Sequence, residues 1–241
     1  MQASLFDDEA AHPKTLRASG ADTALTGRQK ILLLALNFIP LAHVTITLAL
    51  LVFSPGNWFT RALLALAALY LLPPAIAYLV RTRWKIPEGR IAVGSTPFFA
   101  WWALFQLQMI FCRLPALEEA LRLVPGAYSA WLRLWGARIG RLTFWAPGTF
   151  VLDRPFVEIG NDVVFGAGVR INPHVVVKSS AGKFELLLGA VRLGDGAQVG
   201  GYSLLTAGAE IAPNESTDAR LLLPPFCSFK GGKRIRARER E

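Results

Sequence analysis

His174 is the residue of this 241-residue chain best suited to proton transfer at neutral pH. It lies in the segment Asn172-Pro173-His174, whereas His12 belongs to a polar N-terminal stretch and His43 to a long apolar run. Imidazole has a pKa near 6.5, which suits a general base that activates a hydroxyl or amine nucleophile. A lone histidine can equally be structural, so its place in the fold decides between the two readings.

A carboxylate beside His174 could orient the imidazole ring and stabilise its protonated form. The candidates are Glu185, which follows His174, and Glu158 and Asp162, which precede it. Each of the three could equally be a solvated surface charge. The two cysteines and the three isolated histidines provide neither a disulfide framework nor a zinc cluster, so we expect no metal.

An apolar residue followed by a small or polar one returns every six positions around His174. A period of six fits neither a helix face nor an alternating strand, and it indicates a coil of short strands joined by tight corners. Glycine or another small residue suits such corners. The inward positions are predicted to be Ile159, Phe165, Ile171, Leu193, Val199, Leu205 and Ile211.

This pattern resembles the bacterial hexapeptide-repeat acyltransferases, which fold as a left-handed parallel β-helix. The resemblance covers residues 131–233, and the segment 131–140, WLRLWGARIG, is similar to the start of the β-helix in membrane-linked members. It implies transfer of an acyl group from CoA or acyl carrier protein to a hydroxyl or amine, with no tightly bound cofactor. No nucleophile-elbow motif is present, which favours direct transfer over a covalent acyl-enzyme.

The repeat is interrupted beside His174. From Ile171 to Leu193 the chain has 22 residues instead of the 18 of one three-sided turn, so residues around 178–186 are expected to loop out. In the family such a loop reaches a neighbouring subunit near the catalytic histidine, which supports His174 as the general base. A β-helix of about four turns would also expose apolar flanks, and we therefore expect a homotrimer.

Backbone amides at glycine corners could stabilise the oxyanion of acyl transfer, although each glycine alone is explained by its corner. The glycines considered are Gly166, Gly168, Gly200 and Gly201. The family's terminal Gly-x-Pro-Ala segment is replaced by Lys230-Gly231-Gly232-Lys233-Arg234, which leaves the donor's identity open. The residues assigned to substrate binding are Asn172, Trp101, Trp102, Phe105, Gly200, Gly201, Tyr202, Lys230 and Lys233.

The N-terminal half has the composition of a membrane protein. The chain is 53% hydrophobic with a net charge of +9, and residues 31–53 form an uncharged run long enough to span a bilayer. Residues 62–80 make a second span, and basic residues flank the pair on both outer sides, so both chain ends are predicted to be cytoplasmic. With no nucleic-acid-reading motif present, anionic lipid is the better partner for the positive charge, and we expect no signal peptide.

Three shorter helices are expected between the spans and the repeats, at residues 97–112, 114–123 and 128–134. Their composition favours the membrane surface, where they could hold a lipid-like substrate or serve only as a platform. Within the first span, Asn37, His43 and Thr45 are either functional or engaged in interhelical hydrogen bonds. With 16 residues, the segment 97–112 is marginal for a span and fits a surface or partly inserted helix better than a fully immersed one.

The predicted fold class is therefore α+β, in five segments: a polar stretch 1–30, a transmembrane hairpin 31–80, surface helices 81–136, a β-helix domain 137–229 and a basic tail 230–241. The predicted function is an acyltransferase of the bacterial inner membrane, with a cytoplasmic catalytic domain and a lipidic acceptor or acyl chain. The alternative is a membrane-anchored scaffold without chemistry. A γ-class carbonic anhydrase would need three histidine ligands, and His174 alone is too few.

Overall fold

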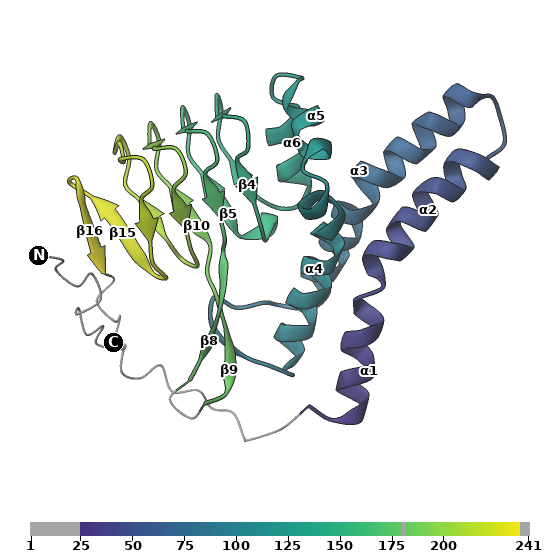
Figure 1. Cartoon of the computed structure of the whole chain (residues 1–241), viewed down its shortest axis with the longest axis horizontal. Coiled ribbons are helices and arrows are strands. Elements are labelled where there is room, and N and C mark those ends of the chain that lie inside the picture. The colour runs from purple at the N-terminus through teal and green to yellow at the C-terminus, as the bar shows by residue number, and fades with distance from the viewer. Residues whose placement is uncertain (1–24, 180–181, 237–241) are drawn as a thin grey trace, which may run out of the picture.

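The structure is a computed structural model that describes residues 25–179 and 182–236. A helical region and a stack of short strands lie side by side, with helix α4 between the outer helices and the strands (Figure 1). Most of the N-terminal stretch 1–30 lies outside the described residues, as do residues 237–241.

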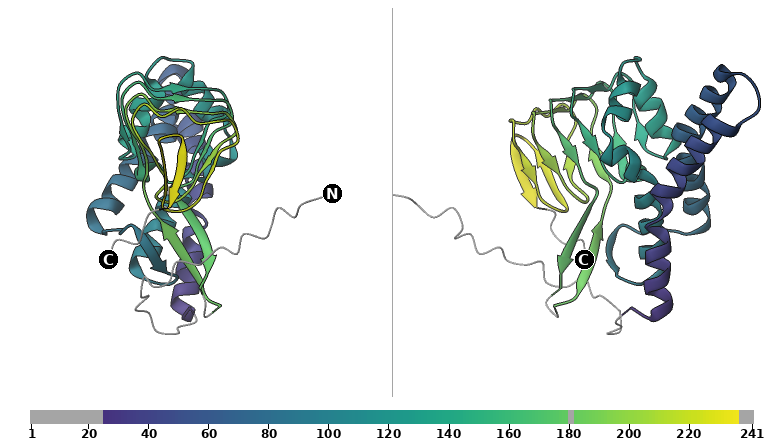
Figure 2. Two further views of the ribbon diagram at one scale, coloured as in Figure 1. Left: turned by 90° about the vertical axis from the view of Figure 1, so that its left-hand side faces the viewer. Right: turned by 45° about the vertical axis from the view of Figure 1, so that its right-hand side comes forward.

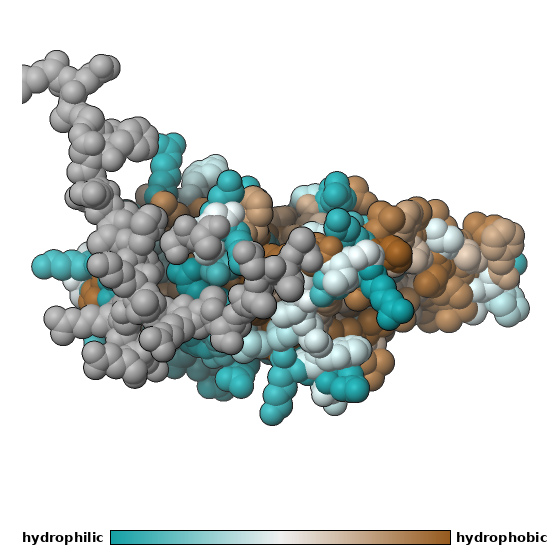
Figure 3. Space-filling view, turned by 90° about the horizontal axis from the view of Figure 1, so that it is seen from below, coloured by the Kyte–Doolittle hydropathy of each residue, from teal (hydrophilic) through white to brown (hydrophobic). Residues whose placement is uncertain are grey.

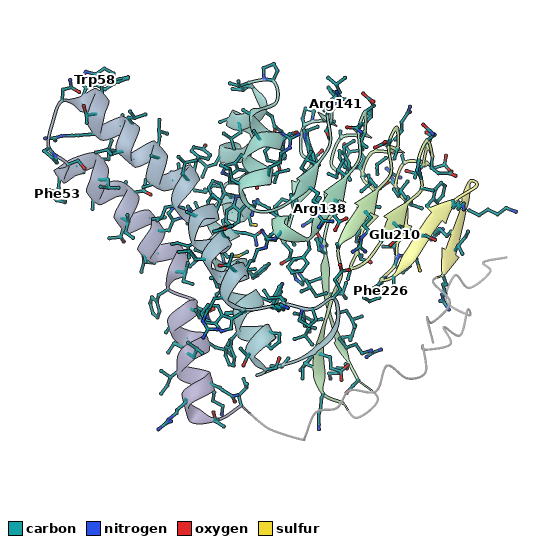
Figure 4. All side chains as sticks on the ribbon, turned by 180° about the vertical axis from the view of Figure 1, so that it is seen from behind. Phe53, Trp58, Arg138, Arg141, Glu210 and Phe226 are labelled. Atoms are coloured by element: carbon teal, nitrogen blue, oxygen red, sulfur yellow. The ribbon has the colours of Figure 1, made fainter. Side chains whose placement is uncertain are left out.

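The first predicted span is a broken helix. Helix α1 (Gly27–Leu36) begins at a capping box in which Thr26 and Gln29 bond each other's backbone amides, and α2 (Ile39–Phe53) restarts with a proline in its first turn. Helix α3 (Trp58–Arg83) passes through Pro73 and Pro74 without ending. Phe53 and Trp58 lie at the tip where α2 turns into α3 (Figure 4).

By length and composition, the stretches Gly27–Phe53 and Trp58–Arg83 could each cross a membrane, both with a mean hydropathy of 2.1. Hydrophobic residues gather over this helical end of the molecule in the view from below (Figure 3). Two polar side chains of the first stretch bond other helices: His43 Nε2 lies 3.2 Å from the carbonyl oxygen of Ala68, and Asn37 accepts from Trp102 and Gln106 of α4. Thr45 is exposed.

Helix α4 (Thr96–Arg113) is largely buried inside the protein. Its covered side chains include Trp101, Leu104, Gln108 and Phe111, each no more than 2% exposed. Two short helices follow, α5 (Ala116–Arg122) and α6 (Ala127–Leu134). The apolar pattern of residues 97–112 predicts a helix at a membrane surface, but here both flanks of α4 are packed, against α2 and α3 on one side and the strands on the other.

The strands form a parallel three-sided β-helix, whose turns superpose in the end view of Figure 2. Its three sheets pair residues one turn apart, for example Phe165 with Val199 and Leu193 with Ile211. The seven predicted inward residues are all buried. One sheet contains β2 (Arg138–Ile139), β5 (Val157–Ile159), β10 (Val191–Leu193), β13 (Glu210–Ile211) and β15 (Cys227–Lys230).

The second sheet contains β3 (Phe144–Trp145), β6 (Val164–Phe165) and β11 (Gln198–Val199), and the third contains β4 (Phe150–Val151), β7 (Arg170–Ile171), β12 (Leu204–Leu205) and β14 (Leu222–Leu223). The corner glycines permit close stacking of successive turns. A Cβ atom on Gly160 would lie 2.6 Å from the backbone nitrogen of Asp195. The six-residue spacing therefore reflects both an inward apolar residue and a corner without room for a side chain.

Two departures from the regular coil are ordered strands. Where a loop is predicted at 178–186, β8 (His174–Lys178) and β9 (Phe184–Leu188) pair in antiparallel fashion, and β1 (Gly89–Ala92) pairs with β9 as a third strand; residues 180–181 of that range lie outside the described residues. In the predicted basic tail, β16 (Lys233–Arg236) folds back on β15 through Gly231 and Gly232, both with positive φ. The tail therefore caps the β-helix as far as Arg236.

Candidate active site

His174 begins the β8–β9 hairpin, and its side chain contacts a buried carboxylate. Nδ1 of His174 forms a short hydrogen bond with Oδ2 of Asp153, whose side chain is 1% exposed, while the His174 side chain is 16% exposed. With Asp153 ionised, Nδ1 donates and the other ring nitrogen, Nε2, is left as the basic atom. Nε2 has no hydrogen-bond partner within residues 25–179 and 182–236.

Asp153 reaches His174 because two successive turns are extended at the same corner. Val151 pairs with Ile171 across the turns, so Asp153 lies two residues beyond one partner and His174 three beyond the other. The step from Val151 to Ile159 is eight residues instead of six, and the extra length forms the 3₁₀ turn η1 (Arg154–Phe156) behind Asp153. Asp153 itself adopts a left-handed conformation with φ of 43°.

Helix α4 completes the surroundings of the pair. Trp101 Nε1 donates a 2.8 Å hydrogen bond to Oδ1 of Asp153, so the two carboxylate oxygens accept from two different side chains. The ring centroids of Trp101 and Phe105 lie 5.0 and 5.2 Å from that of His174, both edge to face. Of the predicted substrate-binding residues, Trp101 therefore holds the carboxylate, Phe105 lines the imidazole, and Trp102 bonds Asn37 through Nε1 at 3.0 Å.

These contacts set the pKa of His174. Burial lowers this pKa, but the charge of Asp153 and the hydrogen bond to it raise it, and the net direction is above the ordinary value of 6.5. The pair has the arrangement of a general base whose protonated form is stabilised by a carboxylate. Proton acceptance at Nε2 is the chemistry that this geometry supports.

The carboxylates predicted from the sequence do not contact His174. Glu185 pairs with Arg90 at 2.8 Å and lies opposite Val177 on the hairpin, where it links β9 to β1. Glu158 lies on the outer face of its sheet, 3.7 Å from Arg192, and Asp162 occupies a corner with φ of 56°. Glu158 and Asp162 lie about one turn before His174, as Asp153 does, but on the following strand and corner, and only Asp153 contacts the imidazole.

The predicted glycine amides lie at another corner. Gly166 and Gly168 stack with Gly200–Tyr202 where the second sheet turns into the third, whereas His174 lies where the third turns into the first. The amide of Gly200 already donates to Thr217 Oγ1 at 3.0 Å, and those of Gly166 and Gly168 donate to backbone carbonyls. Within this chain these glycines therefore lie at a different corner from His174, and so does Tyr202, which is predicted to bind substrate.

Of the remaining residues predicted to bind substrate, Asn172 lies near His174 and the two lysines lie far from it. Asn172 is two residues from His174, and its side-chain oxygen is buried without a hydrogen-bond partner among the described residues. Lys230 and Lys233 face each other across the β15–β16 turn, at the end of the β-helix away from α4 (Figure 1). No group of three or more metal-binding side chains occurs in the part of the chain that the structure describes.

No protein-family model matches the chain, and no curated protein matches it. Among solved structures, it is similar to a hexapeptide-repeat containing acetyltransferase from Vibrio cholerae O1 biovar eltor complexed with acetyl coenzyme A. The identity is 16% and the TM-score 0.38, over 55% of this chain and 88% of that one. A maltose O-acetyltransferase from Clostridium difficile 630 gives 16% and 0.35, over 55% of this chain and 86% of that one. These values are too low to transfer residue roles.

Proposed function

We propose that the chain is a membrane-bound acyltransferase that moves an acyl group from a CoA or acyl carrier protein thioester to a hydroxyl or amine. The observation that carries this proposal is the pair of His174 and Asp153, in which Nε2 has no hydrogen-bond partner among the described residues and α4 packs beside the ring. An imidazole whose Nε2 is available to accept a proton can activate a nucleophile that must lose a proton as it attacks.

The proposed reaction is a direct transfer. Nε2 of His174 takes the proton of the acceptor hydroxyl or amine. At the same time the acceptor's oxygen or nitrogen forms a bond to the carbonyl carbon of the thioester. The tetrahedral intermediate then breaks the carbon–sulfur bond, and the imidazolium returns the proton to the leaving thiolate. Asp153 stabilises the imidazolium between these two steps, and no redox chemistry is involved.

The proposed substrate is lipid-like, as donor chain or as acceptor. Trp101 and Phe105 contact His174 and are themselves packed in an aromatic cluster with Phe98 and Trp102. Trp101 and Phe98 are buried, but Trp102 and Phe105 are partly exposed, and an acyl chain placed against these two rings is stabilised by about 0.8 kcal/mol for each methylene removed from water. The outward apolar residues of α1, α2 and α3, among them Leu34, Leu48 and Leu63, support a hairpin in a membrane. The basic residues that flank the hairpin, such as Lys30 and Arg81, favour the inner membrane with the β-helix on the cytoplasmic side.

The assembly proposed from the sequence is a homotrimer. Exposed apolar residues on the β-helix, such as Phe144 and Leu222, support a partner on its flanks. The pairing of His174 with Asp153 does not depend on it, because both residues and Trp101 belong to one chain. Mass measurement in detergent tests the trimer independently of activity.

The decisive experiment compares cells that express the wild-type chain with cells that express His174→Ala. We expect an acylated lipid in extracts of the first and a loss of about 10²-fold or more in the second. His174→Ala with full activity, or a wild type that changes no lipid and supports partner binding alone, would favour the membrane-anchored scaffold. Glu210→Gln controls for expression, because it removes only an exposed carboxylate on the outer face of the first sheet, 3.6 Å from Arg192.

A further inference from the structure

We propose that Arg154 is a positioning residue, which holds Asp153 at His174 through a buried network with Gln108 of α4 and Glu118 of α5. The expected changes in rate rest on the proposed function, whereas the expected change in the protonation of His174 rests on the geometry alone. Arg154 directly follows Asp153, so whatever fixes its backbone also fixes that of Asp153.

The side chain of Arg154 is fully buried and is paired through its two terminal nitrogens, while its Nε has no hydrogen-bond partner among the described residues. Its Nη2 donates to Oε1 of Glu118 in a short ion pair, and its Nη1 donates to Oε1 of Gln108 at 2.8 Å. The charge also lies over apolar rings: its guanidinium carbon is 5.1 Å from the ring centre of Trp131 and 5.3 Å from that of Trp135. A buried arginine is costly unless every such contact is made, so its position is closely defined.

Gln108 hydrogen-bonds the backbone of Arg154 as well as its side chain. The same Oε1 atom accepts from the backbone nitrogen of Arg154 at 3.0 Å, and Gln108 Nε2 donates to the carbonyl oxygen of Leu104 within α4. This matters because Asp153 has φ of 43°, which is unfavourable for a residue with a side chain unless its surroundings maintain it. Gln108 acts on the peptide unit between Asp153 and Arg154.

Glu118 connects the network to the other helices and to the β-helix. Its Oε2 accepts from Tyr128 at 2.5 Å and lies 3.4 Å from Arg122, whose Nη2 donates to the carbonyl oxygen of Thr149 at 2.7 Å. Burial lowers the pKa of Arg154 but the charge of Glu118 raises it, with a net upward direction, so the guanidinium keeps its charge at working pH. The corner that carries Asp153 is thus attached to α4, α5 and α6.

No second charge competes with Asp153 for His174 among the described residues. From α4 the ring faces only Trp101 and Phe105. On the adjoining strands Glu185 is paired with Arg90, and Glu88, which directly precedes β1, bonds Arg192. The state of His174 therefore reports directly on where Asp153 lies.

The test compares Gln108→Met with Gln106→Met, a matched change two residues away on α4 that removes only a bond to Asn37. The full-length variants are purified in detergent with ¹³C-labelled histidine, and the His174 resonance is assigned by its absence in His174→Gln and titrated. We expect the His174 pKa to fall in Gln108→Met and not in Gln106→Met. In the acylation assay, kcat should fall about 10- to 100-fold in Gln108→Met with KM unchanged.

Arg154→Lys provides a second route, because it keeps a charge for Glu118 but loses the fork that also reaches Gln108. It should shift the titration in the same direction, and it replaces Gln108→Met if that variant does not fold. A folded Gln108→Met or Arg154→Lys protein in which His174 titrates as in wild type overturns the proposal. The titration needs no substrate, so an inactive wild type would refute the proposed function and leave this test intact.

Discussion

Asp153 and His174 come from consecutive turns of the β-helix and meet at the corner where both turns depart from the six-residue period. One departure is the two-residue excess that forms η1, and the other is the β8–β9 hairpin. Insertions at the same corner stack in space, so the two irregularities lie together in the fold.

Replacing Asp153 by Asn tests the carboxylate. An amide offers one acceptor to the two donors of Trp101 and His174, so Nδ1 loses its partner or its tautomer changes. We expect kcat to fall by about 10²- to 10⁴-fold, measured by acyl transfer in detergent.

The pH dependence of the same variant gives a second, signed outcome. A general base acts in its neutral form, so the wild-type rate rises with pH through the pKa of His174, which Asp153 raises above 6.5. Without that charge the acid limb should move to lower pH while the maximum falls. A limb that stays in place would show that Asp153 does not act on the base.

Much of the β-helix could be predicted from the sequence, since the period specifies which side chains point inward and where corners need small residues. His174 was also accessible, as the one histidine beside the interruption of the repeat. Asp153 was not among the predicted carboxylates, because the six-residue phase alone does not show that the corner after Val151 lies against the corner after Ile171. The eight-residue step from Val151 to Ile159 carried the signal, and aligning it with the longer insertion one turn later would have found the residue.

The role of α4 could not be predicted in the same way. Trp101, Phe105 and Gln108 follow helical spacing and lie on one face, but an apolar face with one amide fits a membrane surface as well as a protein core. Whether lipid or protein covers this face of α4 depends on how the helices pack on the β-helix. That packing is tertiary structure, which the local sequence pattern does not specify. The side-chain amide of Gln108 is explained only by the packed structure, in which its oxygen accepts from Arg154.

The stability of the protein should depend on His174 in a defined pH range. The folded-state pKa of His174 lies above 6.5, so the protonated pair stabilises the fold fully below pH 6.5, and this contribution is lost as pH rises through the folded-state pKa. The difference in Tm between wild type and His174→Gln, measured from pH 5.5 to 9 in one detergent, should shrink as pH rises. A difference that grows with pH would contradict the assigned direction.

Trp101→Phe separates the hydrogen bond from the ring. Phenylalanine keeps an aromatic edge against His174 but removes the Nε1 donor that holds Asp153. We expect kcat to fall about tenfold, in proportion to one lost buried hydrogen bond to a charged group, with little change in KM. Trp145→Phe is the matched control. It removes an indole hydrogen bond that runs from the second sheet of the β-helix to Ser129 of α6.

Gly160→Ala tests the stacking of the turns. The new Cβ atom would lie 2.6 Å from the backbone nitrogen of Asp195, and the backbone there cannot yield without separating two turns. We expect a loss of about 1–3 kcal/mol in the free energy of unfolding, measured as a lower Tm. Gly27→Ala, where nothing lies within 4 Å, should stay within about 0.5 kcal/mol of wild type.

The proposal of a lipid-like substrate predicts a dependence of rate on acyl-chain length. If methylenes leave water on binding, each should raise kcat/KM by about fourfold, the equivalent of about 0.8 kcal/mol, until the chain exceeds the site. Phe105→Ala removes part of the apolar surface beside His174 and should flatten this dependence more than it lowers the rate with the shortest donor. The measurement is kcat/KM for a series of acyl thioesters in a fixed detergent.

Phe53→Ala is the control for that series, because Phe53 is 82% exposed at the hairpin tip and far from the β-helix (Figure 4). It should leave the dependence on chain length as in wild type. A wild type whose kcat/KM does not change with chain length would refute an apolar acyl site and shift the lipid character to the acceptor. A wild-type slope that Phe105→Ala leaves intact would place the chain elsewhere than beside Trp101 and Phe105.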